Sequence, residues 1–143
     1  MTHALLDDHL LRDLLADHAP RALAKILNQY EPATTNHYLY RLCKSVVAAR
    51  GGALTGSWST EQRRALGSQL ISLPAEVEVV PMRALAFRMA EISAEHRVST
   101  LGAECVAASE HLDAPVFVWT GDDGPGIRAA MKALRRPYRT IRR

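Results

Sequence analysis

The sequence contains only two cysteines and no long apolar run, internal repeat or low-complexity segment. Cys43 and Cys105 lack the spacings of redox or zinc motifs, so we expect two free thiols in a reducing cytosol. The apolar runs are too short to cross a bilayer, and the N-terminus lacks a basic region followed by an apolar stretch. We therefore expect a cytoplasmic protein without a membrane segment.

The composition is typical of one globular domain, which we expect to span residues 1–143, with 48% hydrophobic and 23% charged residues. The net charge of +3 is unevenly distributed. Residues 128–143 include seven basic residues and no acid, whereas Asp7, Asp8, Asp13 and Asp17 make the N-terminal segment acidic. This pattern suits a protein that handles a polyanion. A solvated helix face and tail is an equally good interpretation.

Short apolar or β-branched runs alternate with helical patterns along the chain. We expect strands at 3–6, 33–35, 76–80, 115–119 and 138–141. Helices are expected to begin near Leu10, Pro20, Asn36, Ser59, Pro81, Ser99 or Thr100, and Pro125. Residues 53–58 are expected to form a loop. This alternation predicts a three-layer α/β/α fold with a mostly parallel sheet of four or five strands.

The expected strand at 115–119 is apolar at nearly every position, which is typical of a strand covered on both faces. Thr120, Gly121, Asp122 and Asp123 follow it directly. Open α/β sheets place their functional sites at the carboxyl ends of such strands. We therefore expect any site of this protein to lie at this edge.

Four acidic residues, Asp7, Asp8, Glu104 and Asp122, fall at expected strand ends or on the helix that leads into one. Because parallel strands end at the same edge of a sheet, these carboxylates can meet. Carboxylates that meet repel one another unless they are protonated or bridged by a cation, and their oxygens suit Mg²⁺ or Mn²⁺. Such a metal can activate water for attack on a phosphodiester. The alternative is that each acid only caps a helix.

At these residues the chain resembles the PIN-domain family, small metal-dependent nucleases that include the toxin ribonucleases of toxin–antitoxin pairs. In the segment LLDDHLL, Asp7 occupies the position of the family's first acid. The segment AECVAAS places Glu104 at the acid of the late helix, and VFVWTGD supplies a Thr-x-Asp motif at 120–122. The resemblance spans nearly the whole chain in element order. It implies a PIN-like fold and a metal-dependent endoribonuclease.

The resemblance also implies roles for single residues. Asp7, Glu104 and Asp122 would bind Mg²⁺ or Mn²⁺ with the help of Asp8 or Asp123, and Thr120 would orient a carboxylate or a water. The basic residues expected to contact RNA are Arg41, Arg128, Lys132, Arg135 and Arg136. The family further implies a small inhibitory protein partner and a homodimer.

The segment TTNHYLYRLCKSV departs from the family pattern, because Arg41 stands where the family has a glutamate before a leucine. An arginine cannot ligate a cation and would repel one. It can instead pair with Asp7 or Glu104 and hold the acids together without a metal. Two interpretations follow: an active metal-dependent ribonuclease, or a catalytically inactive PIN-like module that acts by binding protein or nucleic acid.

Overall fold

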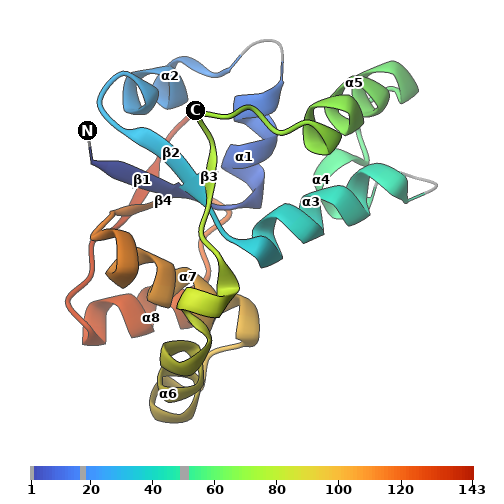
Figure 1. Ribbon diagram of the computed structural model, residues 1–143. Helices are drawn as coiled ribbons and strands as arrows, with labels where there is room; N and C mark the ends of the chain where they lie inside the picture. The colour runs from blue at the N-terminus through green and yellow to red at the C-terminus, as the bar shows by residue number, and fades with distance from the viewer. Residues whose placement is uncertain (1, 17–18, 49–51) are drawn as a thin grey trace.

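Five short parallel strands form one sheet at the centre of the molecule (Figure 1). The computed structural model describes residues 2–16, 19–48 and 52–143. The strands are β1 (His3–Leu6), β2 (Glu31–Thr34), β3 (Glu78–Val79), β4 (Val116–Trp119) and β5 (Tyr138–Ile141). Their order in the sheet is β3-β2-β1-β4-β5, and every neighbouring pair is parallel. The first and fourth strands of the chain therefore lie side by side at its centre.

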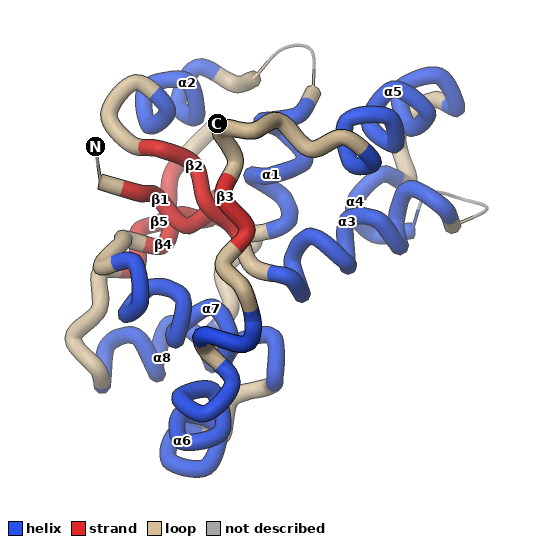
Figure 2. The backbone as a smooth tube through the Cα atoms, in the orientation of Figure 1, coloured by secondary structure: helices blue, strands red, loops and turns tan. Residues whose placement is uncertain are grey.

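Helices connect the strands, as parallel pairing requires (Figure 2). They are α1 (Asp8–Leu15), α2 (Arg21–Leu27), α3 (Asn36–Val47), α4 (Gly52–Thr55), α5 (Thr60–Ile71), the 3₁₀ turn η1 (Met82–Ala84), α6 (Ala86–His96), α7 (Thr100–Leu112) and α8 (Pro125–Ala133). None of the helices described is long and apolar enough to cross a membrane.

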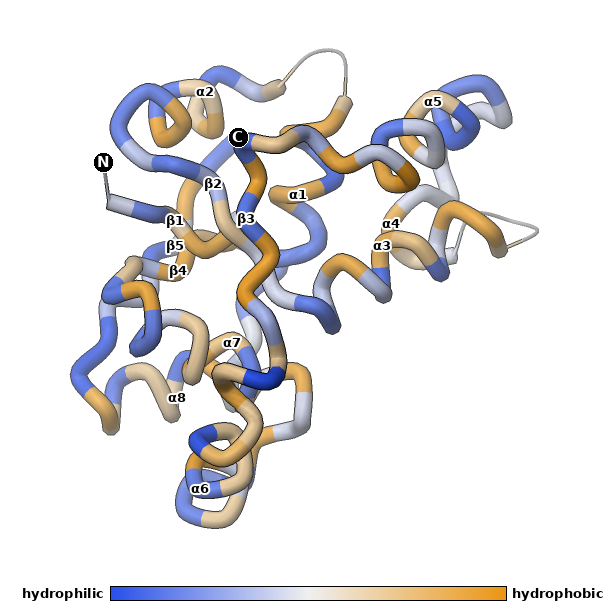
Figure 3. Tube along the Cα trace, in the orientation of Figure 1, coloured by the Kyte–Doolittle hydropathy of each residue, from blue (hydrophilic) through white to orange (hydrophobic). Residues whose placement is uncertain are grey.

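The two faces of the sheet are both covered, which explains the apolar character of the central strands. Leu5 and Val118 face the layer formed by α6, α7 and α8. Leu6, Phe117 and Trp119 face the opposite layer, which contains α1 and α2. Hydrophilic and hydrophobic residues alternate along the covering helices, as expected for helices that bury one side (Figure 3).

A third apolar cluster joins α1 to α3, α4 and α5, which extend to one side of the sheet. It contains Leu11 and Leu15 from α1 together with Leu42, Leu54 and Leu66 from the three other helices. Because α1 belongs to two clusters, its orientation is fixed from both sides.

The predicted three-layer α/β/α fold is confirmed, and β5 and the capping box of Ser59 with Gln62 lie where the sequence placed them. Both cysteines are free thiols, as expected. The loop expected at 53–58 is wrong in its first part, where α4 forms. The Ser45 Oγ accepts the N–H groups of Leu54 (3.2 Å) and Thr55 (3.0 Å), which stabilises this short helix.

Two boundaries also differ from the expected ones. The second strand begins at Glu31, two residues early, because Glu31 and Pro32 pair in register with His3 and Ala4 of β1. The third strand contains only two residues, 78–79, of the five expected, because it lies at the sheet edge and pairs with β2 alone.

Candidate functional site

Asp7 and Asp8 lie where β1 passes into α1, at the carboxyl edge of the sheet. Asp7 is the N-cap of α1, and its Oδ1 accepts the N–H of Leu10 (2.9 Å). Only 3% of Asp7 and 2% of Asp8 is exposed. Burying two adjacent carboxylates is costly unless cations or hydrogen-bond donors compensate for the lost hydration. The positive groups around them therefore determine what this site can do.

His9 lies between these two carboxylates and a third from the end of β4. Its Nδ1 is 3.2 Å from Oδ1 of Asp8 and 3.8 Å from Oδ2 of Asp7. Its Nε2 is 3.6 Å from Oδ1 of Asp122. Acids that follow the carboxyl ends of β1 and β4 therefore surround one imidazole ring.

Charge in this cluster is shared between the imidazole and the acids. The contact with Asp7, followed by that with Asp8, raises the pKa of His9 to about 9. Burial raises the pKa of Asp7, in spite of the opposing contacts with His9 and the backbone of Leu10. In the absence of a metal, His9 is thus a cation at neutral pH and partly compensates for the buried negative charge.

Arg41, on α3, provides a second cation. Its Nη1 lies 3.1 Å from Oδ2 of Asp8, and about half of its side chain is exposed. The sequence led us to expect a pair with Asp7 or Glu104, and the structure corrects the partner to Asp8. The correction follows from helix geometry, because Arg41 lies on the solvent side of α3 and approaches the cluster from outside.

Glu104 is completely buried on α7, and its contacts are directed to the start of α3. Its Oε1 accepts the backbone N–H of His37 (2.9 Å) and lies 2.7 Å from the ring Nδ1 of that residue. Its Oε2 accepts a hydrogen bond from Asn36 Nδ2 (3.1 Å). The structure does not bring Glu104 into the close group of potential ligand atoms that Asp7, Asp8 and His9 form.

Glu104 nevertheless belongs to the same neighbourhood as Asp7. Burial raises the pKa of the Cys105 thiol to about 12, and the negative charges of Asp7 and Glu104 both add to the shift. Because Glu104 holds the first turn of α3, it positions the helix that carries Arg41.

We predict that Glu104→Ala lowers the free energy of unfolding by about 2–4 kcal/mol, because it leaves the donors of Asn36 and His37 without their buried acceptor. The matched control is Glu110→Ala on the same helix. That residue forms a partly exposed ion pair with Arg88, which is expected to contribute less than about 1 kcal/mol. Urea denaturation measures both. Equal losses in the two variants would contradict the positioning role of Glu104.

The pH dependence of stability provides a second check on the geometry. The pKa of His9 is raised to about 9 in the fold, above the value of about 6.5 expected in the unfolded chain. The stability that His9 contributes is therefore complete below about pH 6.5 and is lost as the pH rises through about 9. With EDTA present, the melting temperature of the wild type is expected to exceed that of His9→Gln at low pH. The gap should close by about pH 10; a gap that does not change with pH would contradict the contact.

The remaining acids and hydroxyls predicted from the sequence make other contacts. Asp123 does not join the cluster: its carboxylate accepts hydrogen bonds from Arg128 Nε (2.7 Å) and Tyr138 Oη (2.8 Å), and the bond with Arg128 lowers its pKa. The Thr120 hydroxyl donates to the carbonyl of Ile141 (3.1 Å), so it ties β4 to β5. Of the predicted acids, the structure therefore brings together Asp7, Asp8 and Asp122.

The basic residues predicted to contact RNA fall into two groups. Arg128 pairs with Asp123, and Arg136 pairs with Asp113 (3.0 Å) and donates to the carbonyl of Ser109 (2.9 Å). Lys132 and Arg135 are exposed. Of these four residues, Arg128 and Arg136 are thus already paired with groups of the protein itself.

The Asp7–Asp8–His9 group has the properties of a cation site. Each residue offers one ligand atom, these atoms lie within 4.8 Å of one another, and this is the one such group in the part of the chain that the structure describes. Asp8 Oδ2 and His9 Nδ1 are buried and form ion pairs, with Arg41 and with Asp8 Oδ1, but no hydrogen bond of good geometry. Two carboxylates and one imidazole nitrogen fit Mg²⁺ or, better, Mn²⁺. Sequence analysis did not predict His9 as a ligand; its only signal is its position two residues after Asp7.

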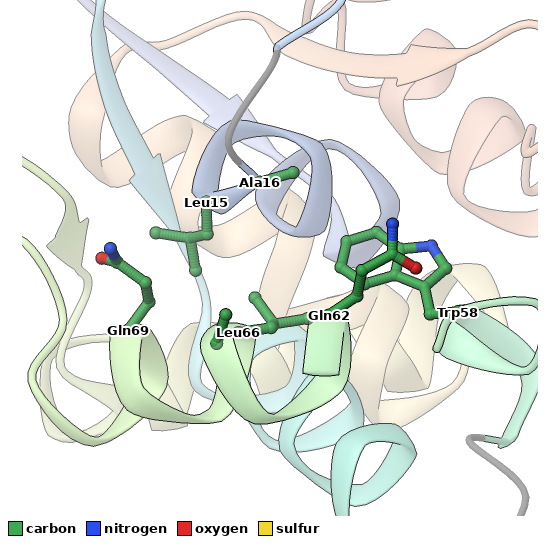
Figure 4. Close-up of a pocket in the computed structure, with 7 residues that line it drawn as sticks. Leu15, Ala16, Trp58, Gln62, Leu66 and Gln69 are labelled. Carbon is green, nitrogen blue, oxygen red and sulfur yellow. The ribbon is translucent and has the colours of Figure 1, made fainter. Parts of the chain in front are cut away.

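A cavity between the end of α1 and α5 lacks such chemistry (Figure 4). It has a volume of about 270 Å³ and is lined by Leu15, Trp58 and Leu66 with two glutamines and two alanines. No acidic or basic side chain lines it. The candidate functional site is therefore the cluster at the carboxyl edge of β1 and β4.

Comparison with known proteins adds information on the fold. No family model and no curated protein sequence matches the chain. Among solved structures, the chain is similar to one from a toxin–antitoxin complex of Klebsiella pneumoniae, with a TM-score of 0.54 and 16% sequence identity. The similarity covers 86% of this chain and 93% of the other. The two chains therefore share their fold over nearly their whole length.

Proposed function

We propose that this protein is a metal-dependent endoribonuclease of the toxin type. The observation that carries the proposal is the Asp7–Asp8–His9 group, whose potential ligand atoms lie within 4.8 Å of one another, with a third carboxylate, Asp122, on the other side of the imidazole. Clusters of this kind at the carboxyl ends of parallel strands are typical of α/β active sites. The resemblance of these residues to PIN-domain motifs favours RNA as the substrate.

In this proposal Asp7, Asp8 and His9 would hold Mg²⁺ or Mn²⁺, and His9 would release its proton to solvent and offer the neutral imidazole as a ligand. When bound, the cation would activate a water and stabilise the negative charge on the phosphodiester. Asp122 lies 3.6 Å from the other ring nitrogen, Nε2, where its carboxylate can hold the imidazole in the orientation that presents Nδ1 to the cation. Glu104 keeps the start of α3 in position.

One observation favours a second candidate function, a catalytically inactive module that acts by binding. Arg41 places a guanidinium 3.1 Å from Asp8 and, together with protonated His9, supplies two positive charges to the cluster. In that case Arg41 and His9 neutralise the acids without a metal, and the protein acts through a binding surface. The two candidates differ in whether a divalent cation displaces these positive charges.

A titration with Mn²⁺ followed by thermal denaturation tests the proposal. A hundredfold excess of Mn²⁺ over its dissociation constant is expected to stabilise the fold by about 2.7 kcal/mol. Single-stranded RNA incubated with the protein and Mn²⁺ should be cleaved, and EDTA should prevent cleavage. Absence of both effects, while a known ribonuclease cuts the same RNA, would exclude the nuclease and favour the inactive module.

The proposal includes a small inhibitory protein partner, because the similar chain of known structure belongs to a toxin–antitoxin complex. Such a partner would occupy the edge of the sheet that carries the site and block access of RNA. Co-expression with the product of a neighbouring gene, followed by co-purification and a cleavage assay, tests this part. A complex that cleaves RNA as fast as the free protein would argue against inhibition.

A further inference from the structure

A second cavity, of about 500 Å³, opens directly beside the candidate metal site. His9 and Asp122 line it, so the cavity and the Asp7–Asp8–His9 group share a wall. Three arginines also line it: Arg12 from α1, and Arg142 and Arg143 from the segment after β5. Arg142 and Arg143 belong to the basic C-terminal segment that suits a polyanion, but they were not among the residues predicted one by one to contact RNA.

The segment after β5 is fixed in place by contacts with the centre of the fold. The backbone N–H of Thr120 donates to the carbonyl of Ile141 (2.8 Å), which continues the pairing of β4 with β5. Asp13, which is almost completely buried, accepts the indole N–H of Trp119 (2.8 Å) and lies 3.0 Å from Nη2 of Arg143. The guanidinium of Arg143 stacks 4.7 Å from the ring centre of Trp119. The residues on this side of the cavity are therefore held in place by contacts with buried groups of the fold.

The charges around this cavity favour an anion. Asp13 is the carboxylate partner of both Arg12 (2.9 Å) and Arg143, so two guanidinium groups share one negative charge. Within the part of the chain that the structure describes, Arg142 forms no ion pair or side-chain hydrogen bond, and it is exposed. Among the described residues, Asp122 is the one acidic residue that lines the cavity, and it already faces His9. An excess of positive charge therefore lies next to the proposed reaction centre.

We infer that this cavity binds the phosphate that neighbours the scissile one in single-stranded RNA, with Arg142 as its main contact. The inference rests on the proposed function and specifies where the substrate backbone lies. A guanidinium is suited to a phosphate because its planar donors match the phosphate oxygens. Arg143 and Arg12 contribute positive potential, while their contacts with Asp13 keep them fixed.

The test measures binding of a fluorescently labelled single-stranded RNA of about 12 nucleotides, a length that several phosphate contacts can cover, by anisotropy in EDTA. Arg142→Gln is expected to raise the dissociation constant by about threefold to tenfold and to reduce the salt slope by about 0.7. Arg142→Lys should keep the salt slope, because it keeps the charge, and should lose part of the affinity, because it lacks the planar donors. The matched control is Arg83→Gln, which removes the same charge from an exposed arginine on η1, outside the cavity.

The outcomes separate the cavity from the nuclease. Because EDTA removes divalent cations, weaker binding of Arg142→Gln supports the cavity even if the protein never cleaves RNA. Equal affinities and salt slopes for Arg142→Gln and Arg83→Gln would overturn the inference, and cleavage by the wild type with Mn²⁺ would leave the proposed function standing. If the wild type does not bind RNA at all, the inference is wrong.

Discussion

Replacing Asp7 with asparagine is expected to abolish Mn²⁺-dependent RNA cleavage while leaving the metal-free protein at least as stable as the wild type. An amide is a far weaker ligand than a carboxylate, so we expect the cleavage rate to fall by about a hundredfold or more. The asparagine can still accept the N–H of Leu10 and cap α1. Asp7→Asn should thus lower the cleavage rate without lowering the stability of the metal-free protein.

The stability part follows from the direction of the pKa shift. Burial raises the pKa of Asp7, so above that pKa the ionised side chain costs folding free energy that a neutral side chain does not. The melting temperature of Asp7→Asn in EDTA at pH 7 should therefore equal or exceed that of the wild type. The control is Asp7→Ala, which also removes the N-cap of α1. It should be less stable than Asp7→Asn by about 1 kcal/mol. Undiminished cleavage by Asp7→Asn would remove this residue from the metal site.

Replacing Arg41 with glutamine is expected to strengthen Mn²⁺ binding by roughly tenfold, because it removes a positive charge that lies 3.1 Å from Asp8. Cleavage at limiting Mn²⁺ should increase with it. Lys44→Gln, which removes a positive charge from the same helix but not from Asp8, is the matched control and should change little. Isothermal titration calorimetry measures the affinity of each variant.

The same variant discriminates between the two candidate functions. If Arg41 neutralises an inactive cluster, Arg41→Gln leaves a buried carboxylate without its cation, and the protein loses stability without gaining a response to Mn²⁺. If the cluster is a metal site, the loss of stability is reversed by Mn²⁺. A variant that neither binds Mn²⁺ more tightly nor loses stability would show that the contact between Arg41 and Asp8 has no role.

The architecture was predictable because strands buried on both faces leave a clear pattern in the sequence. The run at 115–119 is apolar because Phe117 and Trp119 face one helical layer and Val118 the other. The parallel order then places the ends of β1 and β4 next to each other, so Asp7 and Asp122 could be assigned to one edge. The short helix α4 was not predictable, because its stabilising contact comes from the hydroxyl of Ser45 on α3, outside the segment that forms the helix.

The details of the site depended on contacts that no spacing rule encodes. His9 was not assigned because the histidines show no metal-ligand spacing, and only the fold brings Asp122 to its other nitrogen. Glu104 matched the expected position but faces Asn36 and His37, whose amides and ring are brought to it by the packing of α3 on α7. Arg142 and Arg143 were seen only as part of a basic tail, whereas Asp13 anchors that tail beside the site.

The anchoring of Arg143 has a practical consequence for work with this protein. Any residues joined after position 143, such as an affinity tag or a fluorescent fusion, would emerge at the rim of the arginine-lined cavity. There they would compete with the proposed RNA ligand for access and disturb the contact with Asp13. A tag attached before β1 avoids this region, because β1 begins at the edge of the sheet opposite to Asp7.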